Sequence, residues 1–313
     1  ISAALGFAHA RDKLKENHQV VAIIGDGSLT GGMAYEGLNN LGYHRSQLTI
    51  VLNDNSHSIS KSVGALSHYL TRVATNPTYN RIRNDIWEIS GKIPLSKHIR
   101  KIMKKTEEGI KGYLTPGALF EELGLRYIGP INGHNLDELT RTFQAVKKMN
   151  TPVLVHVYTQ KGKGSKLAEK DAIKYYSMGG NIKKITKHIA PDYSNVFGQS
   201  IIQLADKDNK VLCITAAMEI GTGMTPFIEK YPDRYIDVGI AEEHAVTYSA
   251  GLAAEGYKPI VPIYSTFMQR AYDHIFHDAL LQKLPLVYCM DRSGIVGPDG
   301  PTHHGVFDLA FMQ

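Results

Sequence analysis

Short apolar runs rich in β-branched residues alternate with helical patterns along this sequence, and no other feature constrains the fold as strongly. The first half has four such runs, at 19–24, 48–53, 125–129 and 152–158, and the helical patterns between them include 32–41, 136–148 and at least two helices between 62 and 123. Parallel strands need a crossover connection, which is usually a helix. The alternation therefore predicts a parallel sheet with helices on both faces.

The same alternation restarts in the second half, after a stretch at 160–192 that has little apolar periodicity and is typical of a linker. Expected strands lie at 210–215, 235–239, 258–264 and 284–290, and expected helices lie at 193–205, 224–230, 242–254 and 266–282. We therefore expect an α/β protein of two tandem doubly wound parallel-sheet units, with domains at 1–177 and 178–313. Because the sequence stops soon after its last strand, the second unit is expected to lack a strand or more.

Composition and charge fit this class and argue against several others. The 313 residues are 43% hydrophobic and 21% charged, and the net charge of +5 is scattered, with its densest basic run at 97–105. Such a run indicates a solvated helix face, so no nucleic-acid partner is expected. No apolar run approaches the roughly 20 residues that span a bilayer, and no signal peptide opens the sequence. We expect no membrane association and a cytoplasmic location, with a plastid origin left open.

Two cysteines, Cys213 and Cys289, each lie inside an apolar run that is typical of a buried strand. A disulfide framework or a thiolate metal site is therefore not expected, and a reducing compartment fits. The first residue is Ile1 rather than methionine, so we expect this sequence to be an internal fragment.

The stretch GDGSLTGG at 25–32 follows the first expected strand and places Asp26 at the carboxyl edge of the sheet, where open α/β folds bind ligands. Gly25 and Gly27 let the backbone approach a bulky anion, and the N–H groups of the helix that follows favour phosphate. The next expected strand leads into Asn55. A carboxylate and a side-chain carbonyl at neighbouring strand ends are hard oxygen ligands suited to Mg²⁺. The sequence therefore predicts a cradle for magnesium and a diphosphate.

This stretch has three alternative interpretations. A dinucleotide-binding loop needs G-x-G-x-x-G, and Thr30 stands where its third glycine should be; the phosphate loop ending in Gly-Lys-Ser/Thr is absent. A lone GDG is most often just a tight turn. The spacing argues against the turn, because Asp26 and Asn55 lie 29 positions apart (55 − 26) and each follows an expected strand.

This spacing resembles the signature of thiamin diphosphate enzymes, in which Gly-Asp-Gly is followed after some thirty residues by an asparagine. Within that superfamily the sequence resembles the 1-deoxy-D-xylulose-5-phosphate synthase family, and the segments that carry the likeness run in the family's order: GDGSLTGGMAYEGLNN, LNDNSHSIS, LFEELGLRYIGPINGHN, DVGIAEEHAVTYSAGLA, YSTFMQRAYDHIFHD and DRSGIVGPDGPTHHG. Family members have a further segment before this start and a transketolase-like third domain after this end.

The resemblance implies a transferase that uses thiamin diphosphate and Mg²⁺. Its substrates would be pyruvate and D-glyceraldehyde 3-phosphate, which it would condense with loss of CO₂ to 1-deoxy-D-xylulose 5-phosphate, a precursor of non-mevalonate isoprenoids and of vitamins. The cofactor performs the bond chemistry and the protein orients and shields it. The resemblance also implies a homodimer, with a diphosphate-binding first domain and a pyrimidine-binding second domain.

In the first domain the resemblance implies two sets of residues. The metal ligands would be Asp26, Asn55 and His57, and the other cofactor contacts would be Gly25, Gly27, Ser28 and Ser165.

In the second domain the cofactor needs a protonated carboxylic acid beside its aminopyrimidine ring, and a glutamate whose pKa is raised by an apolar setting meets that need. Glu242 and Glu243 are both candidates, and both could equally be first-turn acids favoured by the helix dipole. The resemblance selects Glu242.

The resemblance also implies that Phe267 stacks on the pyrimidine, although a core aromatic is an equal alternative. It implies that His303 moves protons at the substrate, whereas His244 and His304 are expected to be structural. The glyceraldehyde-phosphate site would comprise Tyr264, Arg270, Arg292 and Asp299; a surface ion pair is the alternative for the last two.

The sequence departs from the family at three positions. Ser165 and Tyr176 replace an aromatic residue that touches the cofactor and a histidine that faces the substrate, and Asn132 replaces a common aspartate. Two other functions therefore stay open: another thiamin diphosphate enzyme, such as a transketolase or a 2-oxo acid dehydrogenase component, and a non-catalytic paralogue.

Overall fold

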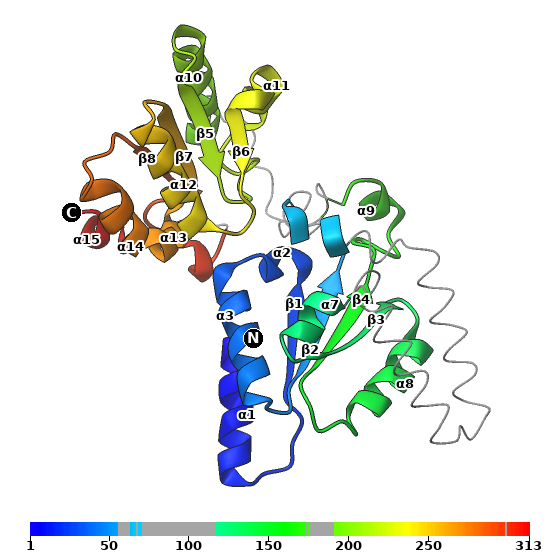
Figure 1. The fold of residues 1–313 in the computed structure, drawn as a ribbon. Coiled ribbons are helices and arrows are strands. Elements are labelled where there is room, and N and C mark those ends of the chain that lie inside the picture. The colour runs from blue at the N-terminus through cyan, green and yellow to red at the C-terminus, as the bar shows by residue number, and fades with distance from the viewer. Residues whose placement is uncertain (56–62, 67, 71–116, 173–174, 176–190, 298) are drawn as a thin grey trace. The chain divides into compact units, whose positions relative to one another are not determined.

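A computed structural model describes residues 1–55, 63–66, 68–70, 117–172, 175, 191–297 and 299–313 (Figure 1). The chain divides into two compact units, the first made of Ile1–His57 and Gly64–Lys161 and the second built mainly from Gly162–Gln313. The predicted basic run at 97–105 and the predicted boundary after residue 177 lie outside the described residues, so both stay predictions. No helix in the described part of the chain has the length and apolar character to cross a bilayer.

The first unit is built on a four-stranded parallel sheet in the order β1-β2-β4-β3. Its strands are β1 (Val21–Gly25), β2 (Thr49–Asp54), β3 (Arg126–Asn132) and β4 (Val153–Tyr158). All four predicted runs are confirmed, with β3 ending three residues later than expected (132 − 129). The parallel register brings the carboxyl ends of the strands to one edge of the sheet.

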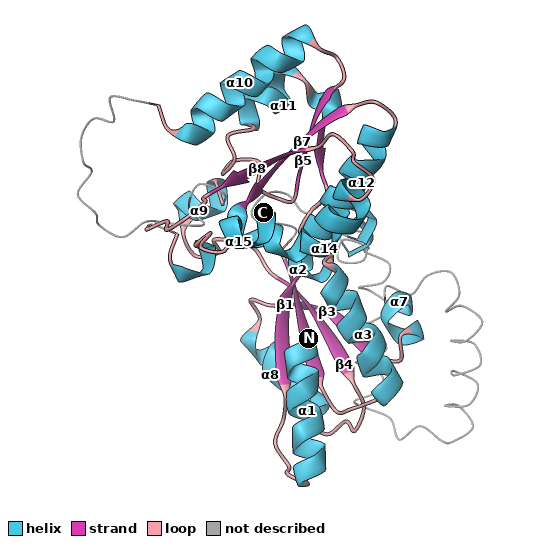
Figure 2. Cartoon of the chain, turned by 90° about the vertical axis from the view of Figure 1, so that its left-hand side faces the viewer, coloured by secondary structure: helices cyan, strands magenta, loops and turns pink. Residues whose placement is uncertain are grey.

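Helices cover both faces of this sheet (Figure 2). On one face α1 (Ser2–Leu14), α3 (Gly32–His44) and α7 (Ala118–Glu122) pack on Ile50 and Leu52. On the other face α8 (Leu136–Val146) packs on the valines of β2 and β4. Successive residues of a strand point to opposite faces, so strands covered on both sides read as continuous apolar runs. The predicted doubly wound arrangement is confirmed for this unit.

The second unit has its own four-stranded parallel sheet, in the order β6-β5-β7-β8. Its strands are β5 (Val211–Thr215), β6 (Tyr235–Asp237), β7 (Lys258–Tyr264) and β8 (Val287–Asp291). One face is covered by α10 (Tyr193–Lys207) and α11 (Thr225–Lys230), and the other by α12 (Glu242–Ala254) and the segments after β7. Cys213 is buried in β5 and Cys289 is half-buried in β8, and both are free thiols, as the sequence predicts.

The expected continuous helix over 266–282 is wrong in detail. The segment consists of α13 (Ser265–Met268), a 3₁₀ turn η2 (Gln269–Ala271), α14 (Tyr272–His274) and a π-helix η3 (Ile275–Leu280). The seven residues at 272–278, YDHIFHD, all come from the weaker part of the helix-propensity ranking. Because propensity is weak there, contacts with the sheet and α12 set the local hydrogen-bond pattern.

The expected linker at 160–192 contains one short helix, α9 (Lys166–Lys170), and two further stretches of it lie outside the described residues. A last short helix, α15 (Asp308–Met312), follows the loop after β8. In the second unit, the predicted site residues lie at or after the carboxyl ends of β6, β7 and β8.

Candidate functional site

In the first unit, the candidate site begins where β1 and β2 end. Gly25 pairs with Asn53 across the two parallel strands, and Asp26 opens the single-turn helix α2 (Asp26–Leu29). Asn55 follows directly after β2. The prediction that Asp26 and Asn55 follow neighbouring strands of one sheet is confirmed, and the predicted helix at 32–41 corresponds to α3.

Asp26 is a buried carboxylate, with 4% of its surface exposed. The Lys161 ammonium interacts electrostatically with Asp26. Burial lowers the pKa of this ammonium, and the negative charge of Asp26 partly opposes that effect by raising it. The sequence reasoning missed Lys161. The signal was available, because the KGKG segment begins three residues after the end of β4 (161 − 158) and hence near the same sheet edge as Asp26.

The strand ends carry side-chain oxygens and have open space at Gly25. An added Cβ at Gly25 would meet no protein atom within 4 Å, so the fold leaves open space there. The oxygens of Asp26 and Asn55 are hard ligands of the kind Mg²⁺ prefers. Among the described residues, no three His, Cys, Asp or Glu side chains converge to bind a metal, so the predicted set depends on the amide oxygen and on phosphate oxygens. His57, the third predicted ligand, lies outside the described residues.

Hydrogen bonds join the loops that follow these strands. Thr159 Oγ1 donates to Asn53 Oδ1 at 2.8 Å, and the Gln160 N–H donates to His134 Nε2 at 2.8 Å. Asn132 Oδ1 accepts from the His134 N–H at 3.0 Å. An aspartate would accept the same hydrogen bond, so the departure from the family at this position leaves the loop unchanged.

In the second unit, Glu242 is the first residue of α12 and is almost fully buried, with 1% of its surface exposed. Burial raises the pKa of its carboxyl above the ordinary value, and Arg270 opposes that rise, with Nη1 3.0 Å from Oε2. Arg270, which was predicted to bind a substrate phosphate, is therefore paired with the predicted catalytic acid. Its side chain is 52% exposed, so the guanidinium also faces solvent.

Three aromatic rings gather at the carboxyl end of β7. Tyr264 and Phe267 are stacked with their centroids 6.0 Å apart, and His303 lies edge-on to Phe267 at 5.3 Å. His303 is also 6.2 Å from the Tyr264 ring. Desolvation raises the pKa of the Tyr264 hydroxyl, which therefore stays protonated near neutral pH. The structure thus brings together three residues that the sequence predicted for one site.

Arg292 connects this aromatic group to the loop after β8. Its guanidinium lies 3.9 Å from the centre of the Tyr264 ring and donates to Asp299 Oδ2 at 2.9 Å. It also donates to the Gly221 carbonyl at 2.8 Å and to Asp291 Oδ1 at 2.7 Å. The geometry is compatible with both interpretations of Arg292 and Asp299, a surface ion pair and a substrate site, because the ion pair exists and lies beside Tyr264.

Gly221 is required by a close approach. A Cβ at this position would lie 1.5 Å from the Tyr264 hydroxyl oxygen. Sequence reasoning could not find Gly221, because its partner is 43 residues away in the chain (264 − 221).

The remaining predicted residues have local roles in the structure. Ser165 is the N-cap of α9, where Oγ accepts from the Ala168 N–H at 3.5 Å. His304 Nδ1 accepts from the Val296 N–H at 3.0 Å, in line with the predicted structural role. Gly27 is buried and Ser28 is exposed within α2. Tyr176 lies outside the described residues.

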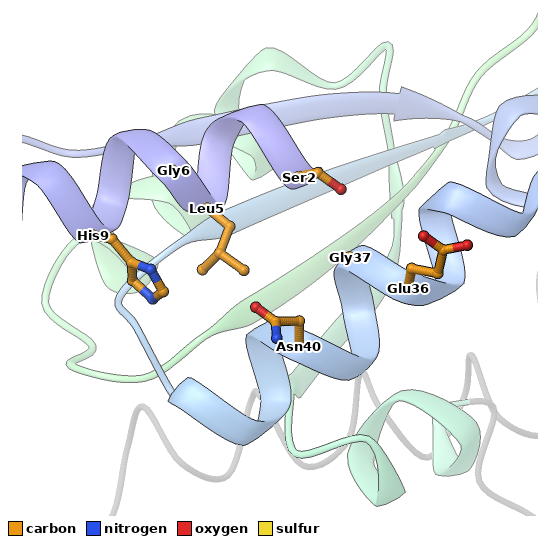
Figure 3. Close-up of a pocket in the computed structure, with 7 residues that line it drawn as sticks. All are labelled: Ser2, Leu5, Gly6, His9, Glu36, Gly37 and Asn40. Carbon is orange, nitrogen blue, oxygen red and sulfur yellow. The ribbon is translucent and has the colours of Figure 1, made fainter.

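A separate pocket of about 390 Å³ lies between α1 and α3 (Figure 3). Leu5 and His9 line it from α1, and Glu36 and Asn40 from α3. It contains none of the predicted site residues.

Comparisons with known proteins agree with this division of the chain. Residues 1–159 match the family described as 1-deoxy-D-xylulose-5-phosphate synthase, and residues 190–313 match the family described as transketolase, pyrimidine binding domain.

Curated relatives match over the whole chain. They include 1-deoxy-D-xylulose-5-phosphate synthase 1 of Geobacter metallireducens, 50% identical over 320 residues, and the 1-deoxy-D-xylulose-5-phosphate synthase of Clostridium kluyveri, 48% identical over 316 residues. Each alignment covers 100% of this chain and 51% of the relative. The chain therefore spans about half the length of the curated relatives it matches.

Proposed function

The chain belongs to the 1-deoxy-D-xylulose-5-phosphate synthase family, and from this membership we propose that it carries the thiamin diphosphate site of such a synthase. The reaction would condense pyruvate with D-glyceraldehyde 3-phosphate, with loss of CO₂, to 1-deoxy-D-xylulose 5-phosphate. The observation that carries the proposal is Glu242, a buried carboxyl with a raised pKa, inside the segment that matches a pyrimidine-binding domain.

In this proposal Asp26 and Asn55 hold a magnesium ion, and His57 is its third protein ligand. Gly25, Gly27 and Ser28 leave the backbone open to the diphosphate, and Ser165 donates a hydrogen bond to the cofactor in place of a stacking ring. Lys161 adds a cation beside Asp26. The bound cofactor supplies a carbon nucleophile and an electron sink for decarboxylation.

The residues of the second unit would prepare the cofactor and receive the substrates. The Glu242 carboxyl holds a proton and donates it in a hydrogen bond to the far nitrogen of the aminopyrimidine ring. Phe267 packs against that ring. His303 moves a proton at the substrate carbonyl or hydroxyl, in the range where imidazole exchanges protons readily.

The phosphate of the aldehyde substrate would be bound by guanidinium groups. Arg292 is placed by Asp299 and by the Tyr264 ring, and the exposed part of Arg270 adds a second cation. Guanidinium groups suit this task because their donors match phosphate oxygens bidentately. We also propose a homodimer and a cytoplasmic location.

Calorimetric titration with thiamin diphosphate, with and without Mg²⁺, tests the cofactor site. We expect magnesium-dependent binding that Asp26→Asn weakens, because an amide removes the negative charge from a metal ligand. The control is Asp12→Asn, which changes an exposed carboxylate in α1. Equal binding with and without Mg²⁺ would contradict the metal role.

Product formation from pyruvate and D-glyceraldehyde 3-phosphate tests the reaction. Glu242→Ala is expected to abolish turnover. Glu243→Gln neutralises the neighbouring acid in the first turn of α12 and is the matched control, which should keep most of the turnover. A product that differs from 1-deoxy-D-xylulose 5-phosphate would indicate another thiamin diphosphate enzyme. Tight cofactor binding without any product would favour a non-catalytic role for this chain.

A further inference from the structure

Three buried polar side chains form a continuous chain across neighbouring strands of the first unit. Tyr127 of β3, His156 of β4 and Asp54 of β2 have 8%, 0% and 3% of their surfaces exposed. The Tyr127 hydroxyl lies 2.7 Å from His156 Nδ1, and His156 Nε2 lies 3.0 Å from Asp54 Oδ2. None of the three belongs to the predicted site.

The order of donors along this chain follows from the chemistry of the groups. A carboxylate only accepts hydrogen bonds, so His156 Nε2 donates to Asp54. In the neutral imidazole the other nitrogen then accepts, and the Tyr127 hydroxyl donates to it. Each ring nitrogen of His156 therefore has a hydrogen-bond partner.

The fold makes a specific space for His156. The pairing of β3 with β4 shifts register between Ile128 and Ile131, and the irregularity contains Gly129. Gly129 has φ +134°, and a Cβ there would lie 2.4 Å from the His156 carbonyl oxygen. The backbones of β3 and β4 therefore approach closely at Gly129 and His156, and this packing restrains the position of His156.

The chain of side chains ends where the proposed metal site begins. Asp54 precedes Asn55, and its carbonyl oxygen accepts from the Thr159 N–H at 2.8 Å. Thr159 Oγ1 also holds the side chain of Asn53. The Asp54 carboxylate is buried against His156, so its side chain is used to anchor the end of β2 rather than to meet a ligand at the sheet edge.

We propose that Tyr127, His156 and Asp54 are positioning residues that fix the carboxyl end of β2, so that Asn55 presents its oxygen to the cation. The inference rests on the proposed function for the identity of that cation. Buried polar groups contribute little net stability compared with well-packed apolar ones, whereas partners that orient metal ligands strongly influence metal affinity. A geometric role therefore explains this buried set better than a stabilising one.

Tyr127→Phe is the sharpest variant, because it removes one hydroxyl and keeps the ring that stacks on Phe120 at 6.0 Å. The matched control is Tyr43→Phe, at a residue of α3 that is 83% exposed. His156→Gln keeps a donor and an acceptor, while His156→Leu has neither, so the glutamine variant should recover part of what the leucine variant loses.

Two measurements on the whole chain decide the matter. By amide hydrogen exchange, we expect the Thr159 N–H to exchange about 2- to 10-fold faster in Tyr127→Phe, which corresponds to the loss of one hydrogen bond. By calorimetry, we expect magnesium-dependent affinity for thiamin diphosphate to fall, but by less than the about 10- to 100-fold that follows removal of a group bonded directly to a metal ligand. Tyr43→Phe should change neither.

The two readouts separate the inference from the proposed function. Unchanged exchange at Thr159 in a folded Tyr127→Phe protein would overturn the inference, and so would faster exchange with unchanged affinity. If the unmodified chain does not bind the cofactor with Mg²⁺, the proposed function fails, and the exchange rates still decide whether the three residues fix the strand end.

Discussion

Glu242 is subject to two opposing influences within a few ångströms. Burial favours its neutral form, and the Arg270 guanidinium at 3.0 Å favours the ionised form. Burial dominates, so the pKa is raised in spite of the ion pair. A neutral carboxylic acid at this position can donate a hydrogen bond, which an ionised one cannot.

The raised pKa predicts how stability depends on pH. Between the ordinary pKa of 4.5 and the raised value, the folded protein binds more protons at Glu242 than the unfolded chain does, so stability falls as the pH rises through this window. Glu242→Gln removes this dependence. We expect the free energy of unfolding of Glu242→Gln, relative to the unmodified chain, to rise with pH from 4.5 upwards by about 1.4 kcal/mol for each unit of pKa shift.

Denaturant titrations at several pH values measure this difference. Glu243→Gln provides the control, because it neutralises the adjacent acid in the same helical turn. Parallel pH profiles for the unmodified chain and Glu242→Gln would show that burial does not raise this pKa.

At the scale of elements, close approaches between backbones decide where helices lie. Gly42 of α3 faces the residues that follow α7, and a Cβ there would lie 1.7 Å from the Leu123 carbonyl oxygen. Gly6 of α1 is also inside a helix, but a Cβ there would meet nothing within 4 Å. Two glycines in helices of one unit therefore have opposite roles.

Alanine substitutions should separate these roles. Gly42→Ala is expected to destabilise the first unit by about 2 kcal/mol or more, because the helix must move away from Leu123. Gly6→Ala is expected to stabilise it by about 0.5–1 kcal/mol, since alanine has the higher helix propensity. Thermal or denaturant unfolding measures both, and equal effects of the two substitutions would contradict the close packing of α3 on Leu123.

Elements with a clear periodicity could be predicted from the sequence, and those set by distant contacts could not. The eight strands and helices such as α8 follow from apolar runs and their spacing. The segment after β7 was expected as one helix, and its π-turn arises from packing of Ile275 and Ala279 rather than from any local signal. Contacts such as Arg270 with Glu242, 28 residues apart, have no pattern in the sequence that would pair them.

The candidate site shows the same limit. The order of Asp26 and Asn55 along the sequence was sufficient to place them after neighbouring strands, because parallel strands end at one edge. The buried set of Tyr127, His156 and Asp54 was not predicted, since each of these residues looks like an ordinary member of an apolar strand or its end.

At the scale of the whole molecule, each unit has its own hydrophobic core. Phe120 is buried in the core of the first unit and Phe227 in that of the second, with 1% and 0% of their surfaces exposed. Two cores on one chain allow local losses of stability that do not spread through the protein.

Phe227→Ala tests this independence. It is expected to cost about 3–5 kcal/mol, as is usual for a buried phenylalanine, and to speed amide exchange in β5 and β7 while leaving β1, β2 and β4 protected. Phe120→Ala is the reciprocal variant and should affect the first sheet. A uniform rise in exchange over both sheets in either variant would show that the units unfold together.

Arg292 has a left-handed backbone, with φ +59°, which an L-residue adopts only at a cost and glycine adopts freely. Glycine would lower the conformational energy of the backbone at this position. It would also remove every contact that the guanidinium makes with Tyr264, Asp299, Asp291 and Gly221. Heat resistance and these side-chain contacts consequently compete at one residue, and selecting variants for endurance alone would discard the guanidinium that joins Tyr264 to the loop after β8.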